Sequence, residues 1–257
     1  MPRYRQIKMN QLLNIKLPEK AKIAVIGDIH GHDQQFFEMV EKIKPDKNRI
    51  IISVGDIKDK GFGKKAETKI INKIQELTKE QIGYIIRGNH EMWHINQAKK
   101  SNQYSEEINW FMTLPFALSF VWPNENRVTV VHGGVTPHHT WKDLENNTDL
   151  VYIRTLNDKG EYIPLKWVEE NGKKVLKAKG AGAVWHETYD GRFGYIASGH
   201  NAQKDGIPKF YKYSCNLDSS VYSTGILTAQ IFERGGLEEM IRVTGPAGSP
   251  GFDPTQR

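Results

Sequence analysis

A short apolar run near the start of the chain ends abruptly in an aspartate and a histidine. Residues 22–31 read KIAVIGDIHG, so strand-favouring side chains lead into Gly27, Asp28, His30 and Gly31. This pattern predicts a buried strand with two potential metal ligands at its C-terminal end. In open α/β sheets, ligands bind outside the carboxyl ends of the strands, and the two glycines permit a backbone tight enough to bring both side chains together. Alone, the motif is a weak signal, because an aspartate after a strand is often a helix cap.

The same design recurs along the chain, which strengthens the signal. Four further apolar runs end in glycine and polar side chains, at residues 49–56, 82–91, 127–134 and 193–200. Helical periodicity at residues 33–43 and 66–77 separates the first three runs. Strands and helices in this alternation predict βαβ units, with the polar residues gathered at one edge of a sheet.

Six side chains at these strand ends offer oxygen or nitrogen to a metal. They are Asp28, His30, Asp56, Asn89, His132 and His200. A donor set without a thiolate suits manganese, iron or zinc, and six donors exceed what one ion needs. The sequence therefore predicts two metal ions, with Asp56 as the carboxylate that bridges them and with a water held for in-line attack on phosphorus.

The length of 257 residues fits one large α/β domain. We expect residues 1–21 to be an N-terminal lead-in, residues 22–244 to form the domain, and the Pro/Gly-rich residues 245–257 to be a flexible tail. Residues 155–179 are polar and rich in lysine, and the pair Asn171 and Gly172 predicts the turn of an inserted β-hairpin. This insert is either a lip over a polyanionic substrate or a solvated excursion.

The composition favours a cytoplasmic protein. The net charge of +6 and the pI near 9.1 indicate either an anionic partner or an ordinary basic surface. Cys215 is the single cysteine, so no intramolecular disulfide can form and a reducing compartment is expected. No run of about 18 apolar residues occurs, so we expect no membrane span.

Five motifs resemble those of the calcineurin-like metallophosphoesterases, specifically the phosphoprotein phosphatase group. They are residues 27–31 (GDIHG), 55–61 (GDIKDKG), 88–91 (GNHE), 132–134 (HGG) and 199–200 (GH). The resemblance runs from about residue 22 to residue 232. It implies an α/β (α+β) fold, a four-layer α/β/β/α sandwich with two mixed central β-sheets, in place of the purely parallel sheet that the βαβ pattern alone suggests.

The resemblance also implies a role for each matching position. Asp28, His30 and Asp56 would hold the first metal, and the second would be held by Asp56, Asn89, His132 and His200. His90 would be the general acid that protonates the leaving oxygen, oriented by Asp59. Arg154 would clamp phosphate oxygens, although it could instead be a buried salt-bridge partner. The other histidines considered, His94, His138, His139 and His186, match no ligand position, and we interpret them as surface residues.

Lys60 departs from the pattern of the protein phosphatases, which usually carry arginine there. Lysine provides a point charge where arginine provides a forked phosphate donor. The Lys-Gly ending and residues 185–191 (WHETYDG) resemble the ApaH-like branch, relatives of the bacterial diadenosine tetraphosphatases, yet that branch often lacks Asp59. A phosphoprotein, a nucleoside polyphosphate and an RNA end therefore all stay open as the phosphorylated substrate.

From the resemblance we expect a two-metal phosphoesterase that hydrolyses phosphate monoesters or phosphoanhydrides by direct attack of a metal-bound water. Manganese is the expected ion, with iron, zinc or nickel as alternatives. A function of a different class is a nucleic-acid-binding module on the same scaffold without turnover, which the basic charge permits. The complete donor set and the pair of Asp59 and His90 speak against that module. The oligomeric state is left open.

Overall fold

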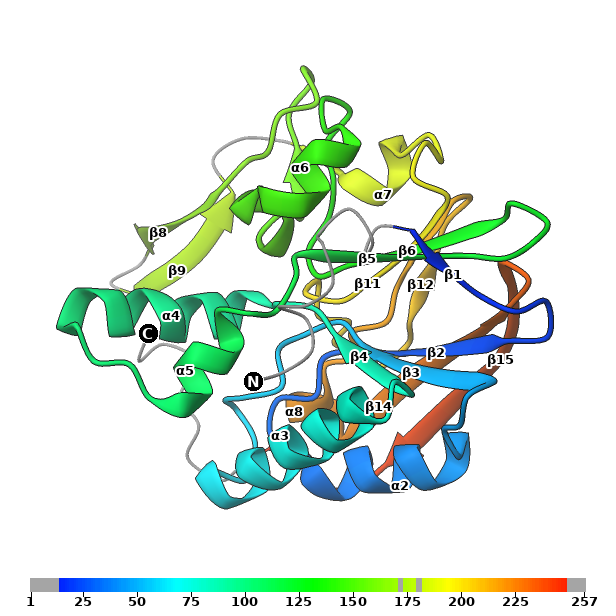
Figure 1. Ribbon diagram of the computed structural model, residues 1–257. Helices are drawn as coiled ribbons and strands as arrows, with labels where there is room; N and C mark the ends of the chain where they lie inside the picture. Colours follow the sequence, from blue (N-terminus) through cyan, green and yellow to red (C-terminus); the bar gives the residue numbers. More distant parts are fainter. Residues whose placement is uncertain (1–13, 171–172, 179–181, 249–257) are drawn as a thin grey trace.

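The computed structural model describes residues 14–170, 173–178 and 182–248. Two mixed β-sheets pack face to face, with helices on the outer face of each (Figure 1). This arrangement confirms the mixed two-sheet sandwich implied by the resemblance, and it corrects the purely parallel sheet suggested by the βαβ pattern alone. The parallel part is real, but antiparallel strands extend it on one side.

The five-stranded sheet has the order β15-β14-β2-β3-β4. Its strands are β2 (Lys22–Ile26), β3 (Arg49–Ser53), β4 (Gly83–Ile85), β14 (Ile226–Glu233) and β15 (Gly236–Thr244). β2, β3 and β4 are parallel, whereas β14 runs antiparallel to both β2 and β15. The helices α2 (Asp33–Ile43) and α3 (Lys64–Lys79) connect the parallel strands, and they confirm the two helices expected from the periodicity.

The six-stranded sheet has the order β1-β5-β6-β11-β13-β12. Its strands are β1 (Ile15–Lys16), β5 (Ala117–Val121), β6 (Arg127–Val131), β11 (Tyr195–Ser198), β12 (Lys209–Phe210) and β13 (Ser214–Asn216). β11 lies parallel to both β6 and β13, so the runs that end at His132 and His200 finish at the same edge.

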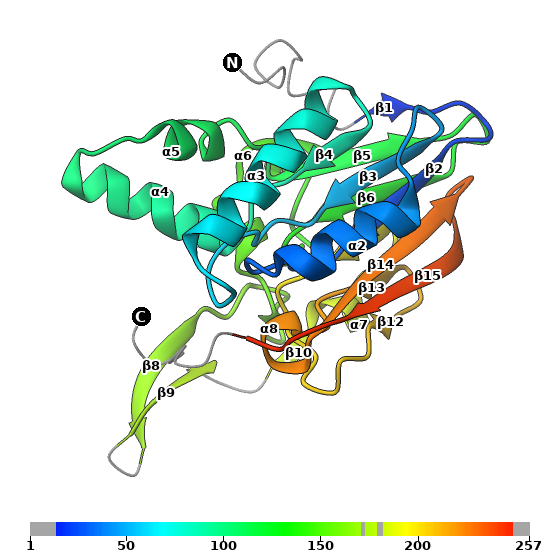
Figure 2. The same cartoon turned by 90° about the horizontal axis from the view of Figure 1, so that it is seen from below.

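The remaining elements surround this sandwich. They are α4 (Asn89–Ser101), α5 (Glu106–Phe111), α6 (Trp141–Asn146), the 3₁₀ helix η2 (Thr148–Val151), α7 (Trp185–Thr188), α8 (Val221–Thr224) and the short antiparallel pair of β7 (Thr155–Leu156) and β10 (Ala183–Val184). α4 and α5 extend from the body on one side (Figure 2).

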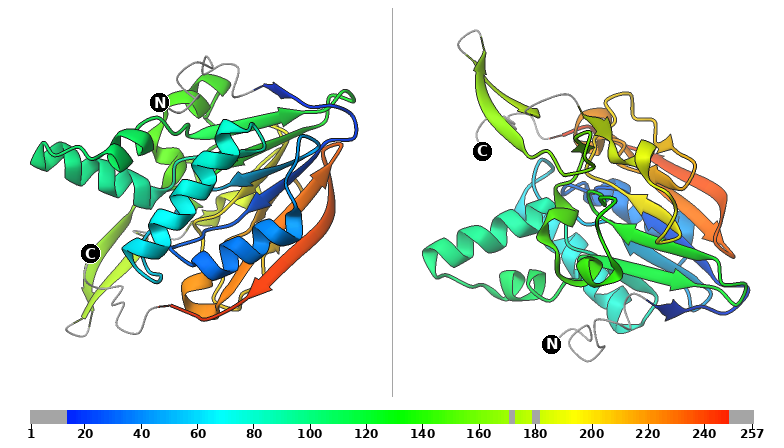
Figure 3. Two further views of the ribbon diagram at one scale, coloured as in Figure 1. Left: turned by 60° about the horizontal axis from the view of Figure 1, so that its bottom comes forward. Right: turned by 90° about the horizontal axis from the view of Figure 1, so that it is seen from above.

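The predicted hairpin within residues 155–179 is formed by β8 (Leu165–Glu170) and β9 (Lys173–Ala178), which pair antiparallel. It projects from the sandwich on the side where α4 also projects (Figure 3). Glu170 pairs with Lys173, and the two residues predicted to form the turn, Asn171 and Gly172, lie outside the described residues.

The structure describes part of the expected N-terminal lead-in and part of the expected C-terminal tail. Residues 1–13 and 249–257 lie outside the described residues, and Ile15–Lys16 form a strand against β5. At the other end, Gly245 donates its backbone N–H to the carbonyl of Gly225, and Gln35 Nε2 donates to the carbonyl of Pro246 at 2.8 Å. The first residues of the expected tail are therefore hydrogen-bonded to the domain.

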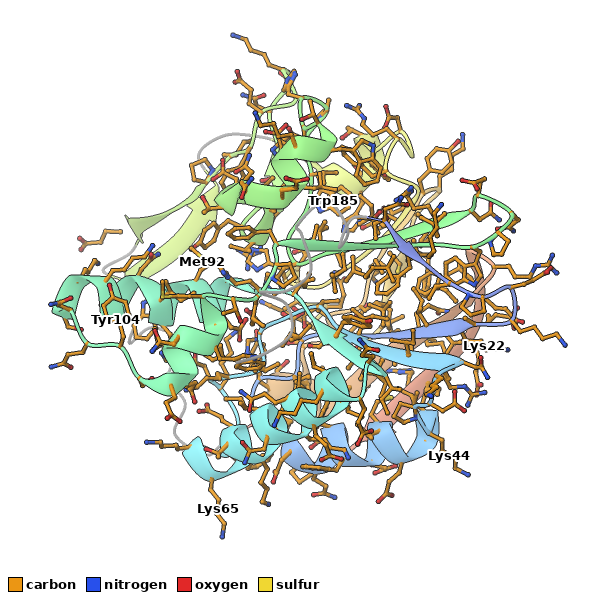
Figure 4. The ribbon with its side chains drawn as sticks, in the orientation of Figure 1. Lys22, Lys44, Lys65, Met92, Tyr104 and Trp185 are labelled. Atoms are coloured by element: carbon orange, nitrogen blue, oxygen red, sulfur yellow. The ribbon has the colours of Figure 1, made fainter. Side chains whose placement is uncertain are left out.

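Two lysines at the ends of α2 and α3 extend into solvent. Lys44 and Lys65 are exposed and point away from the body (Figure 4). Within the described residues, no helix combines the length and the apolar character needed to cross a membrane.

His186 is buried, so its interpretation as a surface residue is wrong. Its ring stacks between Trp185 and Tyr211, with centroid distances of 3.8 and 4.6 Å, and its Nδ1 lies 2.8 Å from Ser214 Oγ. Burial lowers the pKa of His186 to about 3 from the usual 6.5. His138 is exposed, as expected, whereas His139 is half-buried beside Asn147.

The low pKa of His186 should make the protein less stable in acid. Below pH 6.5, His186 binds a proton in the unfolded chain but stays neutral in the folded chain. The free energy of unfolding therefore falls by up to about 1.4 kcal/mol per pH unit until the pH nears the folded-state pKa. His186→Phe keeps a ring in the stack but cannot titrate. Urea unfolding at pH 6.5, 5.5 and 4.5 in a metal chelator should show a shallower decline for this variant. An equal decline of the unfolding free energy with falling pH in the two proteins would contradict the low pKa of His186.

Candidate metal centre

Backbone hydrogen bonds tie the loop after β2 to the loop after β3, and the loop after β11 to the loop after β6. The carbonyl of Asp56 accepts from the N–H groups of Ile29 and His30, and Gly199 donates to the carbonyl of His132. Three residues in these loops adopt left-handed backbone conformations that non-glycine residues rarely use, with φ of 45° at His30, 50° at Asp56 and 68° at His200. Such conformations persist only where the surrounding structure enforces them, and they cluster at functional sites.

Asp56 lies at the centre of the site, and its two carboxylate oxygens face different partners. Oδ2 lies 3.7 Å from Nε2 of His30 and 3.7 Å from Nε2 of His90. Oδ1 lies 3.4 Å from Nε2 of His132. The potential ligand atoms form two groups, His30–Asp56–His90 and Asp56–His132–His200, each with its atoms within 4.8 Å of one another. One carboxylate shared by two donor groups is the arrangement that a pair of bridged cations requires.

The other predicted ligands lie at the same place. Asp28 Oδ2 is 3.9 Å from Nε2 of His30, and the Asp28 carboxylate accepts the backbone N–H of His200 at 3.1 and 3.2 Å. Asn89 Oδ1 is 3.0 Å from Nε2 of His132. The six donors predicted from the strand ends therefore converge in space, although the motifs lie far apart in the chain.

Backbone carbonyls orient each predicted histidine ligand. Nδ1 of His30 lies 2.9 Å from the carbonyl of Lys58, and Nδ1 of His132 lies 2.8 Å from that of Val54. For His200 it is Nε2 that meets a carbonyl, that of Tyr152, at 3.2 Å. A carbonyl on one ring nitrogen fixes the proton there and leaves the other nitrogen free to bind a metal. The ligand atoms would thus be Nε2 of His30 and His132, and Nδ1 of His200.

The electrostatics of the cluster also fit divalent cations. Burial, reinforced by Lys60, lowers the pKa of His30 well below 6.5, and burial with Arg154 does the same to the pKa of His200. Burial opposes ionisation of Asp56, but the neighbouring imidazoles outweigh it and hold the pKa of this carboxyl well below its usual value. Burial opposes a charge on His132, but the Asp56 carboxylate outweighs it and raises the pKa of His132 to about 9. His30 and His200 are therefore neutral, as metal ligands must be, whereas a cation bound at His132 would displace a proton from that ring.

Asp28 has the opposite shift. Burial raises the pKa of Asp28 well above its usual value, and the nearby carboxylates of Asp218 and Asp56 add to the effect. Several buried carboxyl groups that repel one another are costly unless positive charge is placed among them. The donor chemistry therefore fits two divalent cations.

The residues expected to act on the substrate border this cluster. His90 Nδ1 lies 2.6 Å from Asp59 Oδ2. Lys60 Nζ lies 3.1 Å from Nε2 of His30 and 4.6 Å from the centre of the Tyr222 ring. Arg154 donates from Nη2 to the carbonyl of His200 at 3.2 Å. The pair of His90 and Asp59 and the positively charged side chains of Lys60 and Arg154 thus lie around one donor cluster.

Three residues at or beside the site were missed by sequence reasoning. The buried carboxylate of Glu91 accepts the backbone N–H groups of Asp56, Ile57 and Gly88, so it fixes the loop that carries Asp56. Asp218 is buried two residues after the end of β13. The search for polar residues directly after strands, which identified the other ligands, could have found it. His94, interpreted as a surface residue, is only partly exposed and contacts Asp59, so that interpretation is wrong.

Sequence comparison shows similarity to phosphoesterases. Residues 21–208 match the profile of the family described as calcineurin-like phosphoesterase. The chain is also 24% identical over 244 residues to the bis(5'-nucleosyl)-tetraphosphatase PrpE (asymmetrical) of Oceanobacillus iheyensis, an alignment that covers 82% of this chain and 88% of the relative.

Solved structures resemble the fold. A crystal structure assigned provisionally as a diadenosine tetraphosphatase matches with a TM-score of 0.66 and 20% identity, covering 91% of this chain and 99% of that one. A protein serine/threonine phosphatase from Saccharomyces cerevisiae, similar to human phosphatase PP5, matches with a TM-score of 0.55 and 17% identity, covering 97% and 89%. At such identities the likeness establishes the fold alone.

Proposed function

This chain belongs to the calcineurin-like phosphoesterase family and is a hydrolase of phosphoric ester bonds, and we propose that it cleaves nucleoside polyphosphates with the help of two divalent cations. The observation that carries the two-metal proposal is Asp56: its Oδ2 faces Nε2 of His30, which lies beside Asp28, and its Oδ1 faces Nε2 of His132. When bound, the cations would polarise both a water molecule and the phosphoryl oxygens. We take manganese as the working ion and the cytoplasm as the compartment.

The cationic side chains would bind the phosphate. Lys60 and Arg154 approach the donor cluster beside different ligands, His30 and His200 respectively, so a phosphoryl group between them would be held from two sides. Their positive charges favour the charge that develops on the phosphoryl oxygens.

His90 would supply the proton to the leaving oxygen. Its Nδ1 contacts Asp59, and its Nε2 faces the carboxylate of Asp56. With Nδ1 held by Asp59, Nε2 is the nitrogen directed toward the donor cluster and the one able to give its proton to the substrate.

Two observations support a nucleoside polyphosphate as the substrate. The curated relative is named as a bis(5'-nucleosyl)-tetraphosphatase, and Lys60 replaces the forked arginine of protein phosphatases. The short contact between His90 and Asp59 favours a second candidate, a phosphoprotein, because an alkoxide leaving group needs a strong acid more than a polyphosphate does.

A substrate panel with manganese tests the proposal. We expect the ratio kcat/KM for a dinucleoside tetraphosphate to exceed that for a phosphoserine peptide by about 10-fold or more, a difference of roughly 1.4 kcal/mol in transition-state binding. Triphosphate-ended RNA and a single-stranded polynucleotide without phosphate ends complete the panel. Each assay is repeated with a chelator, which should abolish turnover until manganese is restored.

The outcomes separate the candidates. Preference for the phosphopeptide would replace the proposed nucleotide substrate by a phosphoprotein. Preference for the triphosphate-ended RNA would replace it by an RNA end. Binding of the bare polynucleotide with no turnover of any phosphate would favour a nucleic-acid-binding module and overturn the proposed function.

A further inference from the structure

His94 lies on α4 one helical turn after His90, and both imidazoles reach the same carboxylate. Nε2 of His94 lies 3.2 Å from Asp59 Oδ1 and 3.3 Å from Oδ2, while Nδ1 of His90 lies 2.6 Å from Oδ2. Residues four apart share one face of a helix, which explains how both can contact Asp59. The side chain of Asp59 is 11% exposed and that of His94 is 22% exposed, so water has limited access to this contact.

The loop that carries Asp59 has an unusual backbone conformation, and a hydrogen bond to Glu67 anchors it. Asp59 and Lys60 are both in the left-handed region, with φ of 67° and 62°. The backbone N–H of Asp59 donates to Glu67 Oε1 at 2.8 Å, which anchors the main chain. This backbone anchor does not fix the rotation of the carboxylate about its own bonds. A donor shared between the two oxygens does fix it, because the shared bond is lost when the carboxylate turns.

We propose that His94 is a positioning residue: its Nε2–H holds the Asp59 carboxylate in the orientation in which Oδ2 receives the Nδ1–H of His90. This inference rests on the proposed function, because it assigns His94 to the acid pair of that reaction. It predicts that loss of the His94 donor slows reactions that need a proton on the leaving oxygen and leaves substrate binding unchanged.

A structural role for the ring is the competing explanation, and the contacts of His94 define it. The ring meets Trp93 edge to face at a centroid distance of 4.9 Å and lies 6.4 Å from Phe111. Two substitutions separate the explanations. His94→Phe keeps an aromatic ring and removes the donor, whereas His94→Gln removes the ring and keeps an N–H donor at a similar distance from the backbone.

The experiment measures kcat and KM with manganese for an alkyl phosphate, a poor leaving group, and for p-nitrophenyl phosphate, an activated one. We expect His94→Phe to lower kcat about 10-fold or more on the alkyl phosphate and by less than about 3-fold on the activated ester, with KM unchanged. His94→Gln should stay within about 3-fold of the wild type on both substrates. Circular dichroism and thermal melting check the fold, and His94→Met serves as the donor-free variant should the phenylalanine variant not fold.

Each contrary outcome has a distinct meaning. A wild-type protein that hydrolyses neither of these esters nor a dinucleoside tetraphosphate would overturn the proposed function and this inference with it. A wild type that hydrolyses only the dinucleoside tetraphosphate would overturn the inference alone, because no poor leaving group would then receive a proton. An active wild type matched by His94→Phe on both substrates would overturn the inference alone. Equal losses on the two substrates, or a larger loss in His94→Gln than in His94→Phe, would show that the ring matters for packing and would also overturn it.

Discussion

Asp56→Asn should reduce manganese-dependent turnover of p-nitrophenyl phosphate by about 10³-fold or more, the equivalent of roughly 4 kcal/mol. The carboxylate of Asp56 faces His30 from one oxygen and His132 from the other. An asparagine would keep one oxygen, lose the negative charge and present a donor where the second oxygen stood. One of the two donor groups would therefore lose its shared ligand. Isothermal titration with manganese should show fewer or weaker sites, a readout that does not depend on catalysis.

The fold should survive this substitution for two local reasons. Asparagine tolerates the left-handed backbone that Asp56 adopts, with φ of 50°. Its amide oxygen can still accept the backbone N–H of His90, which the carboxylate accepts at 2.9 Å. Asp205→Asn, which alters an exposed carboxylate paired with Lys209, is the matched control and should keep full turnover. Turnover retained by Asp56→Asn would refute the bridging role.

The strand ends could be predicted because the geometry of parallel strands leaves little freedom. Asp28 and Asp56 follow neighbouring parallel strands, β2 and β3, so their side chains had to emerge at one edge. Glycine at position 199 has a comparable reason: a Cβ there would collide with Oδ1 of Asp28. The second sheet, which brings His132 and His200 to the same edge, followed only from the family resemblance, because no local pattern specifies how two sheets face each other.

The missed residues depend on contacts between distant segments. The four-residue spacing between His90 and His94 is visible in the sequence, but the position of Asp59, on a loop 35 residues before His94, is not. His186 lies in a helix of only four residues, too short to show the periodicity that distinguishes a buried face from an exposed one. Tertiary packing determines the positions of both His94 and His186. Motif matching contains no information about such packing, so it could not show that these two histidines are shielded from solvent.

His90→Asn should slow hydrolysis of an alkyl phosphate by about 10² to 10⁴-fold and that of p-nitrophenyl phosphate by less than about 10-fold. His90 has its Nδ1 fixed by Asp59 at 2.6 Å, so the proton available to a leaving oxygen is carried on Nε2. Asparagine cannot supply that proton at neutral pH, but its backbone N–H can still donate to Asp56 and its amide can still reach toward Asp59. The measurement is kcat on both substrates at saturating manganese.

Two further substrates make the His90 prediction diagnostic of the proposed function. The leaving group of a phosphoanhydride is a stable anion near neutral pH, so His90→Asn should slow hydrolysis of a dinucleoside tetraphosphate less than that of a phosphoserine peptide. His138→Asn, which alters an exposed histidine bonded to the carbonyl of Lys159, is the matched control and should behave as wild type. Equal losses on all four substrates would mean that His90 supports the metal ligands and donates no proton. A graded loss that follows the basicity of the leaving group would identify it as the acid.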